Sequence, residues 1–510
     1  MRLSLLLRGS EALGVSGNPD GEVASICYDS RQCGPGSLFA AIPGLKEDGH
    51  AFIADAVNRG AGFIVHESEY LPPAGVTAVR VRNSRRCLGI LAKNFFGDPS
   101  AALCLIAIVG TNGKTTVTYL LEAILRAAGY SVGVLGTINY RYGGESFPAP
   151  NTTPESFEMQ RILREMSDQG VTHCVAEVSS HAIDLRRVDD CTFDFGVFTN
   201  LTQDHLDYHG TMEAYYQAKK RFFSEVLPAG GKDHRRRMGV NCDDPWGRRL
   251  CKEVGAGAAT YGLENPCDVS AAPFHLSAGG IDATLHYDNE HIAVASPLLG
   301  RFNLYNILAA VTAARALEIP GPVIGRGIEA LAHVPGRLER VSTAGQPAVF
   351  VDYAHTDDAL RRVLQNLSEL RTGKIITVFG CGGDRDKGKR PLMGEAATTH
   401  SDLTIVTSDN PRSEDPLAII GEIEKGIRVD KSKDIGDTEP NSSSQRYLVI
   451  PDRRAAIAAA IGLAGVADIV LIAGKGHEDY QIIGSQKFPF DDRTIARGEL
   501  SRWQRERGGS

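Results

Sequence analysis

The chain has 510 residues, of which 42% are hydrophobic and 23% are charged, and this is the composition of an ordinary globular protein. At roughly 150 residues a domain, the length predicts about three domains. A net charge of −7 and a pI near 6.1 argue against a general nucleic-acid-binding surface.

The cysteines and the apolar runs exclude further classes of protein. The ten cysteines are scattered without a C-x-x-C pair, which is typical of reduced thiols rather than of a zinc site or a disulfide framework. The first apolar run ends at Arg8 and is too short for a signal peptide. No stretch approaches the ~20 apolar residues of a membrane span. We therefore expect a soluble cytoplasmic protein that binds neither membranes nor nucleic acids.

The N-terminal part of the chain contains short strand-like runs between helical stretches. These runs are Ser37–Ile42, Gly62–Val65 and Val76–Val81. They predict a small α/β domain over residues 1–97.

Stronger apolar strands begin after residue 102 and alternate with amphipathic helices. Leu103–Val109 leads into a helix at Thr115–Ala128, and a helix at Ser156–Gln169 leads into a strand at Thr172–Val178. Such alternation indicates βαβ units and a parallel sheet. We predict a central α/β domain over residues 98–334.

The alternation restarts after VPGR (334–337), which predicts a C-terminal Rossmann-like α/β domain over residues 335–510. Its predicted strands are Ala348–Val351, Ile375–Phe379, Leu403–Thr407 and Ile469–Ala473. The polar stretch Asp430–Gln445 is rich in Pro and Ser and is predicted to be a surface loop insertion.

The strongest local signal is LIAIVGTNGKTT (105–116), a buried strand that runs into a glycine-rich turn and a helix. The N–H groups of such a turn bind polyphosphate, with Lys114 on the β- and γ-phosphates and the Thr115 hydroxyl on Mg²⁺. The pattern G-x-x-x-x-G-K-[ST] is incomplete because Ile108 stands at the first glycine position, and Gly110 takes over part of that role. An ordinary Gly-Lys turn is the alternative, but strand, turn and helix all fall where phosphate binding requires them.

A phosphate loop alone indicates only nucleotide binding. A GTPase switch would carry an N-K-x-D motif, which the chain lacks. The remaining interpretation is an enzyme that uses ATP on a second substrate.

Acidic and histidine residues follow two further predicted strands. Glu177 could hold Mg²⁺ directly, and His205, Asp204 and Asp207 follow the strand that ends near Thr199. A single histidine is more often a capping or core residue, but three strand ends that meet at one crevice favour a site. Lys219, by contrast, is expected from its residues alone to be a solvated helix lysine.

The sequence SDNPR (408–412) follows the strand predicted at Leu403–Thr407, and Pro411 ends that strand. Ligand sites of parallel sheets lie just outside the carboxyl ends of the strands. Arg412 is therefore either an ordinary surface arginine or a residue that contacts a substrate, and the residues alone leave both open.

Ten motifs in order give the chain a family resemblance over nearly its whole length. The chain resembles the ATP-dependent Mur ligases of peptidoglycan synthesis, and most of all those that add the third residue of the peptide. The motifs are GTNGKTT (110–116), NTTP (151–154), EVSSH (177–181), TNLTQDHLDYHG (199–210), GRFNLYN (300–306), PGRLE (335–339), DYAHT (352–356), GCGGDRDKGKRPLM (380–393), SDNPR (408–412) and GKGHEDYQ (474–481).

The resemblance implies a three-domain ligase for a uridine nucleotide, ATP and an amino acid. In such ligases a peptide carboxylate attacks the γ-phosphate of ATP to give an acyl phosphate, and an amine then displaces phosphate to leave an amide. Two anions meet in the first step, so the site needs the positive charge of Lys114 and Mg²⁺. The implied metal ligands are Thr115, Glu177, His205 and Lys219, the last as a carbamylated lysine.

The resemblance also implies the binding residues. ATP would be bound by Gly110, Thr111, Asn112, Gly113, Lys114, Thr115 and Thr116, and from the far side of the cleft by Asn303, Arg337, Asp352 and His355. Ser30 and the turn at 45–47 would bind the uridine part, and Asn151, Thr152, Thr153, Ser179 and Arg187 the muramoyl-peptide. One departure is Asp357, where the family has proline, and it concerns only the turn near His355.

Ligases of this type add either L-lysine or meso-diaminopimelate, which carries one more carboxylate. An arginine fork binds a carboxylate and repels the lysine ammonium. The resemblance therefore implies that Arg412 selects meso-diaminopimelate for transfer to UDP-N-acetylmuramoyl-L-alanyl-D-glutamate. We expect the protein to be a monomer. The other implied contacts are Arg390, Asp409, Asn410, Pro411, Gly474 and Glu478.

Two rival interpretations differ in class. A folylpolyglutamate synthetase would share the phosphate loop and DYAH but not the N-terminal domain or DNPR. A nucleotide-binding protein without chemistry of its own would not need EVSSH and HLDYH beside the loop.

Overall fold

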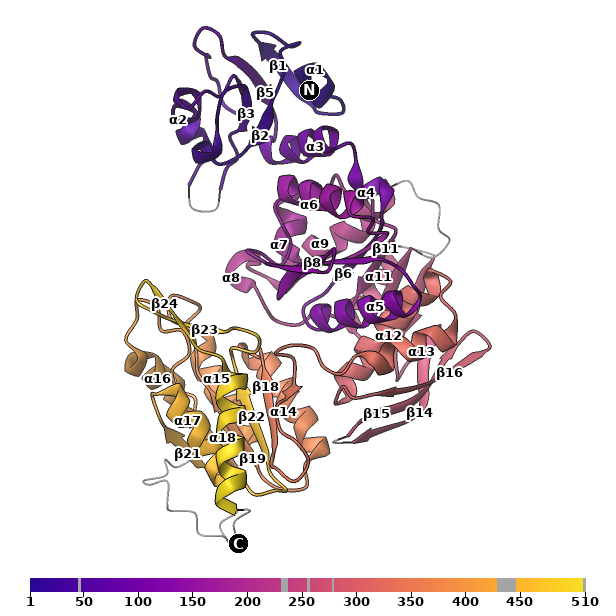
Figure 1. Ribbon diagram of the computed structural model, residues 1–510, viewed down its shortest axis with the longest axis vertical. Coiled ribbons are helices and arrows are strands. Elements are labelled where there is room, and N and C mark those ends of the chain that lie inside the picture. The colour runs from indigo at the N-terminus through magenta and orange to yellow at the C-terminus, as the bar shows by residue number, and fades with distance from the viewer. Residues whose placement is uncertain (45–46, 231–236, 255–256, 278, 429–445, 508–510) are drawn as a thin grey trace.

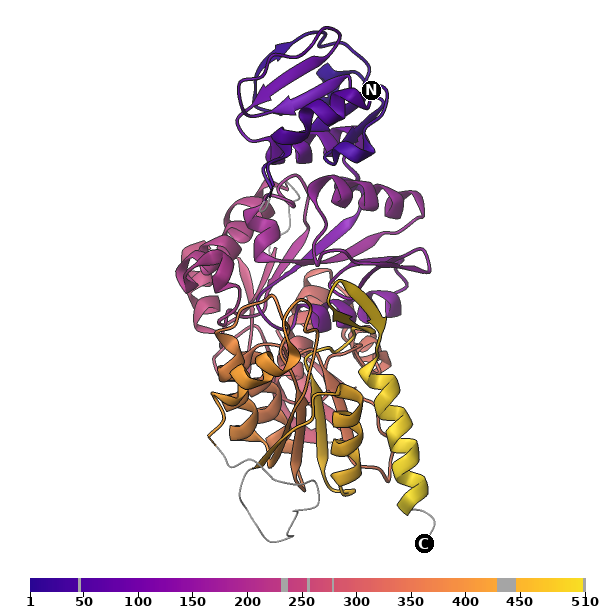
Figure 2. The ribbon, with the colours of Figure 1, turned by 90° about the vertical axis from the view of Figure 1, so that its left-hand side faces the viewer.

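The computed structural model describes residues 1–44, 47–230, 237–254, 257–277, 279–428 and 446–507. It has a mixed α/β fold with three larger sheets, which follow one another along the long axis of the molecule (Figures 1 and 2). This agrees with the fold class predicted from the sequence.

The N-terminal sheet has five strands in the order β1-β5-β4-β3-β2 and is parallel except for the edge strand β1. Its strands are β1 (Ala12–Ser16), β2 (Ser25–Cys27), β3 (Ser37–Ala40), β4 (Phe63–His66) and β5 (Thr77–Val81). Its helices are α1 (Leu3–Leu6), η1 (Ser30–Gln32), η2 (Gly49–Phe52), α2 (Ile53–Asn58) and α3 (Ser84–Phe96), and the short α4 (Pro99–Ala102) follows.

The central sheet has eleven strands in the order β16-β15-β14-β13-β12-β11-β6-β10-β7-β8-β9. Its strands are β6 (Cys104–Val109), β7 (Val132–Leu135), β8 (Asn139–Tyr142), β9 (Glu145–Pro148), β10 (His173–Val178), β11 (Phe195–Phe198), β12 (Met238–Asn241), β13 (Ala258–Tyr261), β14 (Val269–Ser277), β15 (Gly280–Tyr287) and β16 (Glu290–Ser296). The helical segments are α5 (Lys114–Ala127), α6 (Ser156–Asp168), α7 (Ser180–Asp184), α8 (Leu206–His209), α9 (Met212–Arg221), η3 (Phe222–Val226), α10 (Leu227–Ala229), α11 (Pro245–Val254), α12 (Arg301–Ala316) and α13 (Gly321–Ala330).

Helices cover both faces of the central sheet. The side chains of β6 illustrate this, because they point alternately into the two cores that these helices form. Ile106 and Ile108 pack into one core with α5, α12 and α13, whereas Leu105, Ala107 and Val109 pack into a second core with α6, α9 and η3. Successive side chains of a strand point to opposite faces, so a strand buried on both faces must be apolar throughout.

The C-terminal sheet has six strands in the order β17-β18-β22-β19-β20-β21, all parallel except the short edge strand β17. The strands are β17 (Glu339–Arg340), β18 (Ala348–Asp352), β19 (Ile375–Phe379), β20 (Leu403–Val406), β21 (Arg446–Val449) and β22 (Ile469–Ala473), beside a separate hairpin of β23 (Tyr480–Ile483) and β24 (Gln486–Pro489). The helices α14 (Asp357–Leu370), α15 (Lys389–His400) and α16 (Pro416–Glu424) pack on one face, and α17 (Arg453–Leu463) and α18 (Asp492–Arg507) on the other.

The three sheets also contact one another through named side chains. Arg85 of α3 pairs with Glu155, the N-cap of α6, which ties the N-terminal lobe to the central sheet. Leu299, just before α12, is buried in the core of the C-terminal sheet. These contacts place the N-terminal and C-terminal sheets on either side of the central one.

The predicted strands and helices agree with the structure to within two residues at most ends. The prediction that the central sheet is parallel is wrong at its edges, where β14, β15 and β16 form an antiparallel meander and β8 and β9 a hairpin. Most of the predicted insertion Asp430–Gln445 lies outside the described residues. No helix among the described residues is long and apolar enough to cross a membrane.

One buried ion pair ties α17 and α18 together in the C-terminal core. The Arg453 guanidinium donates to both carboxylate oxygens of Asp492, at 2.8 and 2.6 Å, and both side chains are 0% exposed. The same guanidinium donates to the Ala473 carbonyl at the end of β22.

We expect Asp492→Asn to destabilise the C-terminal sheet by about 3–5 kcal/mol, because it leaves the Arg453 charge buried without its partner. Urea unfolding followed by circular dichroism measures the change. The matched control is Glu506→Gln, which breaks an exposed pair with Arg502 on the same helix and should cost less than about 1 kcal/mol. Equal effects of the two substitutions would contradict this account.

Candidate functional site

The glycine-rich turn between β6 and α5 has the backbone of a phosphate loop. Gly110 and Gly113 have φ of 151° and 88°, and these values favour glycine. Ile108 lies inside β6 and is fully buried, so the missing first glycine of the pattern falls in the strand. The Lys114 ammonium donates to the carbonyls of Gly110 and Thr111, at 3.0 and 2.9 Å, and so lies folded over the turn.

The segment 199–202, just after β11, holds this turn by hydrogen bonds. The Thr199 hydroxyl donates to the Asn112 carbonyl at 2.7 Å, and the Asn200 side chain accepts from the Asn112 N–H at 2.9 Å. Asn112 in turn donates to the Thr202 hydroxyl at 3.0 Å. The turn is thereby held in place before any ligand binds.

Glu177, at the end of β10, lies against the start of α5. Its side chain is almost fully buried, and one carboxylate oxygen accepts from the Thr115 hydroxyl at 3.2 Å and the Thr137 hydroxyl at 2.8 Å. The other oxygen accepts from the Thr137 N–H at 3.1 Å. The structure thus brings Thr115 and Glu177 together, as predicted, and adds Thr137.

The residues predicted to bind the muramoyl-peptide gather around Glu177. The hydroxyl of Thr152 lies 3.1 Å from that of Thr137, and the Thr153 hydroxyl donates to the Glu177 carbonyl at 2.8 Å. Arg187 donates to the Thr153 carbonyl, and the Ser179 N–H donates to the Thr153 hydroxyl. Asn151 is exposed nearby, and its carbonyl accepts from Tyr140.

His205 lies at the start of α8 with a φ of 53°, an uncommon value outside glycine. Its ring packs edge-on against that of His181, with 4.8 Å between centroids, and lies near Asp204. Burial of part of the ring lowers the pKa of His205, so the imidazole is neutral at pH 7, as a metal ligand must be. His205 makes no hydrogen bond to Thr115 or Glu177 among those the structure describes.

The prediction from residues alone that Lys219 is solvated is wrong. Its side chain is only 1% exposed, and its ammonium donates to the Gly110 carbonyl at 2.8 Å and lies over the Tyr215 ring. Burial, together with the nearby Lys114 charge, lowers the pKa of Lys219 well below its ordinary value. Helix α9 therefore places an amine directly under the phosphate loop.

Two segments beyond the central strands also reach the loop. The Arg337 guanidinium donates to the Thr115 hydroxyl at 3.2 Å and lies over the Tyr353 ring. Asn303 accepts from Asn306 at 3.0 Å, and the Asn306 side chain lies against Gly113. The structure thus brings Arg337 to Thr115 and, through Asn306, Asn303 toward the loop; their contact with a nucleotide stays a prediction.

Asp352 and His355 take different positions near Arg337. Asp352 is 6% exposed, and its two oxygens accept from the N–H groups of Leu338 and Ala354, so it shapes the turn that carries Arg337. His355 is exposed, and its ring contacts the Tyr353 carbonyl. Asp357 is the first residue of α14, where an acidic side chain suits the helix N-terminus as well as proline would.

Ser30 lies in η1 of the N-terminal sheet, with its side chain nearly buried. Its hydroxyl donates to Asp55, which lowers the pKa of that carboxyl. Two of the three residues of the turn at 45–47 lie outside the described residues, so the structure places only Ser30 and Glu47 of the predicted uridine site.

Arg412 follows Pro411 at the carboxyl edge of the C-terminal sheet. Its φ of 50° is uncommon for a residue with a Cβ, and its N–H and carbonyl bond to Ile482 and Gly484 beside β23. One guanidinium nitrogen donates to the Gly383 carbonyl at 2.7 Å. Arg412 is partly exposed and forms no ion pair with any residue the structure describes.

Arg390 differs from Arg412 in all these respects. Its side chain is fully buried and donates to both oxygens of Glu414 and to Glu422, at 2.7–2.9 Å. It also donates to the Gly382 carbonyl. The Arg390 charge is therefore already paired within the protein, and Arg390 and Arg412 bond to the neighbouring carbonyls of Gly382 and Gly383.

Asp409, Asn410, Gly474 and Glu478 lie together at the same edge. Asn410 donates to a Glu478 oxygen at 2.9 Å, and a Cβ on Gly474 would lie 3.0 Å from an Asp409 oxygen. Burial, reinforced by the Asp409 charge, raises the pKa of Glu478. The edge thus places the Arg412 guanidinium, which forms no ion pair with a described residue, near the carboxylates of Asp409 and Glu478.

Thr115 and Glu177 fit Mg²⁺, because they offer a hydroxyl and a carboxylate oxygen within contact of each other. Mg²⁺ is commonly held by one or two carboxylates together with water and phosphate oxygens. No group of three or more His, Cys, Asp or Glu side chains that could hold a metal ion occurs in the described part of the chain. Thr115 and Glu177 alone would leave most coordination positions of Mg²⁺ to water or to a phosphate ligand.

The sequence alone missed Thr137, Asn306 and Thr202. Thr137 follows the end of β7, so the rule that ligands meet strand carboxyl ends could have indicated it. Asn306 and Thr202 act through contacts that only the folded chain brings together.

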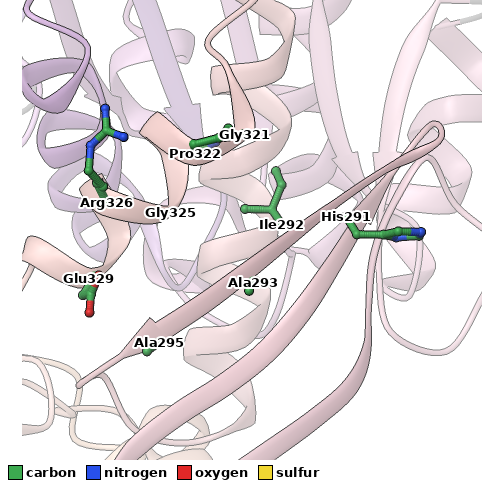
Figure 3. A pocket seen from close by; sticks show the side chains of 9 residues that line it. All are labelled: His291, Ile292, Ala293, Ala295, Gly321, Pro322, Gly325, Arg326 and Glu329. Atoms are coloured by element: carbon green, nitrogen blue, oxygen red, sulfur yellow. The ribbon is translucent and has the colours of Figure 1, made fainter.

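The central sheet also carries a cavity of about 260 Å³ that contains none of these residues. It lies between β16 and α13, with His291, Arg326 and Glu329 on its walls (Figure 3). Its lining offers no convergent set of polar groups like that at the phosphate loop, so we place the chemistry at the loop.

We expect Gly113→Ala to weaken ADP binding roughly tenfold or more. A Cβ there would lie 2.3 Å from the Asn306 oxygen, and Asn306 is itself buried and hydrogen-bonded. Titration calorimetry with ADP measures the effect. Gly129→Ala is the control, because Gly129 has nearly the same φ, 87°, with no heavy atom within 4 Å of its Cβ. It should cost about 1 kcal/mol of stability and leave ADP affinity unchanged, and equal affinities of the two variants would contradict the assignment of the loop.

Family models of three kinds match the chain in order. The Mur ligase family catalytic domain matches residues 22–96, the Mur ligase middle domain residues 108–314, and the Mur ligase glutamate ligase domain residues 336–476.

Known proteins agree with these matches. The chain is 49% identical over 495 residues to the UDP-N-acetylmuramoyl-L-alanyl-D-glutamate--2,6-diaminopimelate ligase of Geobacter metallireducens, with 97% of each chain covered. A solved structure of a ligase with the same name is 33% identical, with a TM-score of 0.67 and 96% of each chain covered. The MurF ligase of Thermotoga maritima in complex with ADP is 19% identical and has the same fold, with a TM-score of 0.61 and coverage of 94% of this chain and 97% of that one. The chain belongs to the Mur ligase family.

Proposed function

We propose that this chain is an ATP-dependent amide ligase that adds meso-2,6-diaminopimelate to UDP-N-acetylmuramoyl-L-alanyl-D-glutamate in peptidoglycan precursor synthesis. The identity of 49% to a ligase of that name supports the reaction. The structural observation that carries the choice of amino acid is Arg412, which lies partly exposed at the carboxyl edge of the C-terminal sheet and forms no ion pair with a described residue.

The phosphate loop and its surroundings suit transfer of the γ-phosphate of ATP to a carboxylate. Lys114 would exchange its bonds to the Gly110 and Thr111 carbonyls for phosphate oxygens. Arg337, already on the Thr115 hydroxyl, would add positive charge from the C-terminal side. Mg²⁺, when bound by Thr115 and Glu177 with His205 and a carbamylated Lys219, supplies further neutralisation of the phosphate charge.

The peptide substrate would lie along the residues that surround Glu177. Thr152 contacts Thr137, and Ser179 and Arg187 both bond to Thr153, so these four residues would contact the peptide together with the exposed Asn151. Ser30 would bind the uridine part in the N-terminal sheet. We propose domain boundaries near residues 97 and 335, so that each sheet binds one of the three substrates. A monomer that works in the cytoplasm stays a prediction.

Arg412 would bind the second carboxylate of meso-diaminopimelate, which lies at the far end of the side chain and which L-lysine lacks. A guanidinium binds a carboxylate through two parallel hydrogen bonds and carries its charge at every working pH. The Arg412 guanidinium donates to the Gly383 carbonyl through one nitrogen, and its other donors are left for a ligand. Glu478, beside it, would bind an ammonium group of the same amino acid.

Phosphate release from ATP tests the proposed reaction. We expect release only when both UDP-N-acetylmuramoyl-L-alanyl-D-glutamate and meso-diaminopimelate are present, with L-lysine a poor replacement. Release that needs neither substrate would indicate a nucleotide-hydrolysing protein of another kind, and a preference for L-lysine would overturn the choice of amino acid.

We expect Arg412→Ala to raise the KM for meso-diaminopimelate by the equivalent of about 2–5 kcal/mol, because a charged bidentate contact is lost. The KM for ATP should stay nearly unchanged in the same phosphate-release assay. Arg371→Ala is the control, since it removes one exposed positive charge before β19, at the other end of the sheet. Unchanged diaminopimelate kinetics in Arg412→Ala would show that another residue selects the amino acid.

We expect Lys219→Ala to lose activity by a factor on the order of 10²–10³, because the carbamate that Lys219 would carry is absent. Acetate or propionate should restore part of the phosphate release by entering the space under the loop. The exposed Lys252→Ala serves as the control. Full activity of Lys219→Ala would refute the carbamate, and a loss that no carboxylate rescues would leave Lys219 with a purely structural role.

A further inference from the structure

One buried lysine lies behind the residues proposed to bind the amino acid. Lys475 follows Gly474 at the end of β22, and its side chain is 0% exposed. Its ammonium donates to the Asn410 side-chain oxygen at 3.0 Å and to the Tyr480 carbonyl at 2.7 Å. It also lies 3.2 Å from an Asp409 oxygen and 3.6 Å from a Glu478 oxygen.

These contacts fix the orientation of the Asn410 side chain. Because its oxygen accepts from Lys475 and from the Ile482 N–H, its nitrogen must point the other way, and it donates to Glu478 at 2.9 Å. A buried ammonium can only donate, so it sets the direction of every bond around it. Lys475 thereby orients the Glu478 carboxylate in two ways, through the hydrogen bonds of Asn410 and by direct electrostatic attraction.

Lys475 also offsets the repulsion between two carboxylates. Asp409 and Glu478 lie in one partly buried cluster, where burial and like charge favour protonation of one of them. Lys475 lowers the pKa of Glu478 against both effects. A protonated Glu478 could not bind an ammonium, so its charge matters to the ligand.

The other charged and titratable groups around Glu478 do not duplicate this contact. Arg453 is fully buried and its charge is paired with Asp492, and Tyr353 and Tyr480 are neutral at pH 7. The groups that face Glu478 from the packed elements are Asp409, Lys475, Tyr353, Tyr480 and Arg453.

We propose that Lys475 is a positioning residue that keeps Glu478 ionised and directed toward the ammonium of the incoming amino acid. The proposal rests on the proposed function for the identity of that amino acid. The coupling between Lys475 and Glu478 is a property of the free protein and can be measured without any substrate.

Lys475→Met keeps the length of the side chain and removes its charge. We expect the KM for meso-diaminopimelate to rise roughly 10- to 100-fold while the KM for ATP changes little. The acid limb of the pH profile of kcat/KM for diaminopimelate should move to higher pH, because Glu478 without Lys475 binds its proton more tightly. In a Glu478→Gln background the same substitution should add little, since the two residues act as a unit.

A measurement independent of activity separates this proposal from the proposed function. Carbon NMR of isotope-labelled glutamate carboxyl groups, with Glu478 assigned by its loss in Glu478→Gln, should show a higher Glu478 pKa in Lys475→Met than in the unmodified chain. If Lys475→Met does not fold, Lys475→Arg keeps the charge and should leave the Glu478 pKa near its original value. An unchanged Glu478 pKa in Lys475→Met, a raised one in Lys475→Arg, or additive losses in the double variant would overturn the proposal. Absence of diaminopimelate turnover in the unmodified chain would instead overturn the proposed function.

Discussion

The Thr115 hydroxyl is the point at which three distant parts of this chain meet. It is the second residue of α5, it donates to the buried Glu177 carboxylate at the end of β10, and it accepts from Arg337, which lies just before the C-terminal sheet. A hydroxyl can donate to one partner and accept from another at once, and Thr115 does both here. This contact and the apolar packing of Leu299 into the C-terminal core both join the C-terminal sheet to the central one.

The parallel arrangement of the strands explains why the predicted site residues gather at the carboxyl edges of the central and C-terminal sheets. The carboxyl ends of β6, β7, β10 and β11 deliver the phosphate loop, Thr137, Glu177 and the segment that begins at Thr199. The carboxyl ends of β18, β20 and β22 deliver Asp352, the turn that carries Arg412, and Gly474. Each group lies on a rigid strand end, which holds functional side chains more closely than a long loop would.

The sequence predicted most of this arrangement because its signals are local. The apolar run of β6, the glycines at 110 and 113 and the helix that begins at Lys114 are all decided by neighbours in the chain. Thr115 and Glu177 could be paired because strand ends share an edge. The motifs that resemble Mur ligases then indicated the substrates, which no periodicity could have supplied.

The residues that the sequence misplaced depend on contacts across the fold. Lys219 has the pattern of a surface helix, but α9 packs under the loop and buries it. The sequence also could not show that Glu414 and Glu422 pair with Arg390 while no described residue forms an ion pair with Arg412; a contact of either arginine with the substrate stays a prediction. The antiparallel meander of β14–β16 was missed because its strands alternate buried and exposed residues and lack the continuous apolar runs by which the buried strands were recognised.

The central chemical claim is that ATP phosphorylates a carboxylate of the peptide before the amine attacks. The most direct measurement uses UDP-N-acetylmuramoyl-L-alanyl-D-glutamate with a heavy oxygen isotope in the carboxylates of its glutamate, followed by mass analysis of the released phosphate. An acyl-phosphate route predicts that each phosphate formed during amide synthesis carries one labelled oxygen from the substrate. Amide formation with unlabelled phosphate would contradict the account.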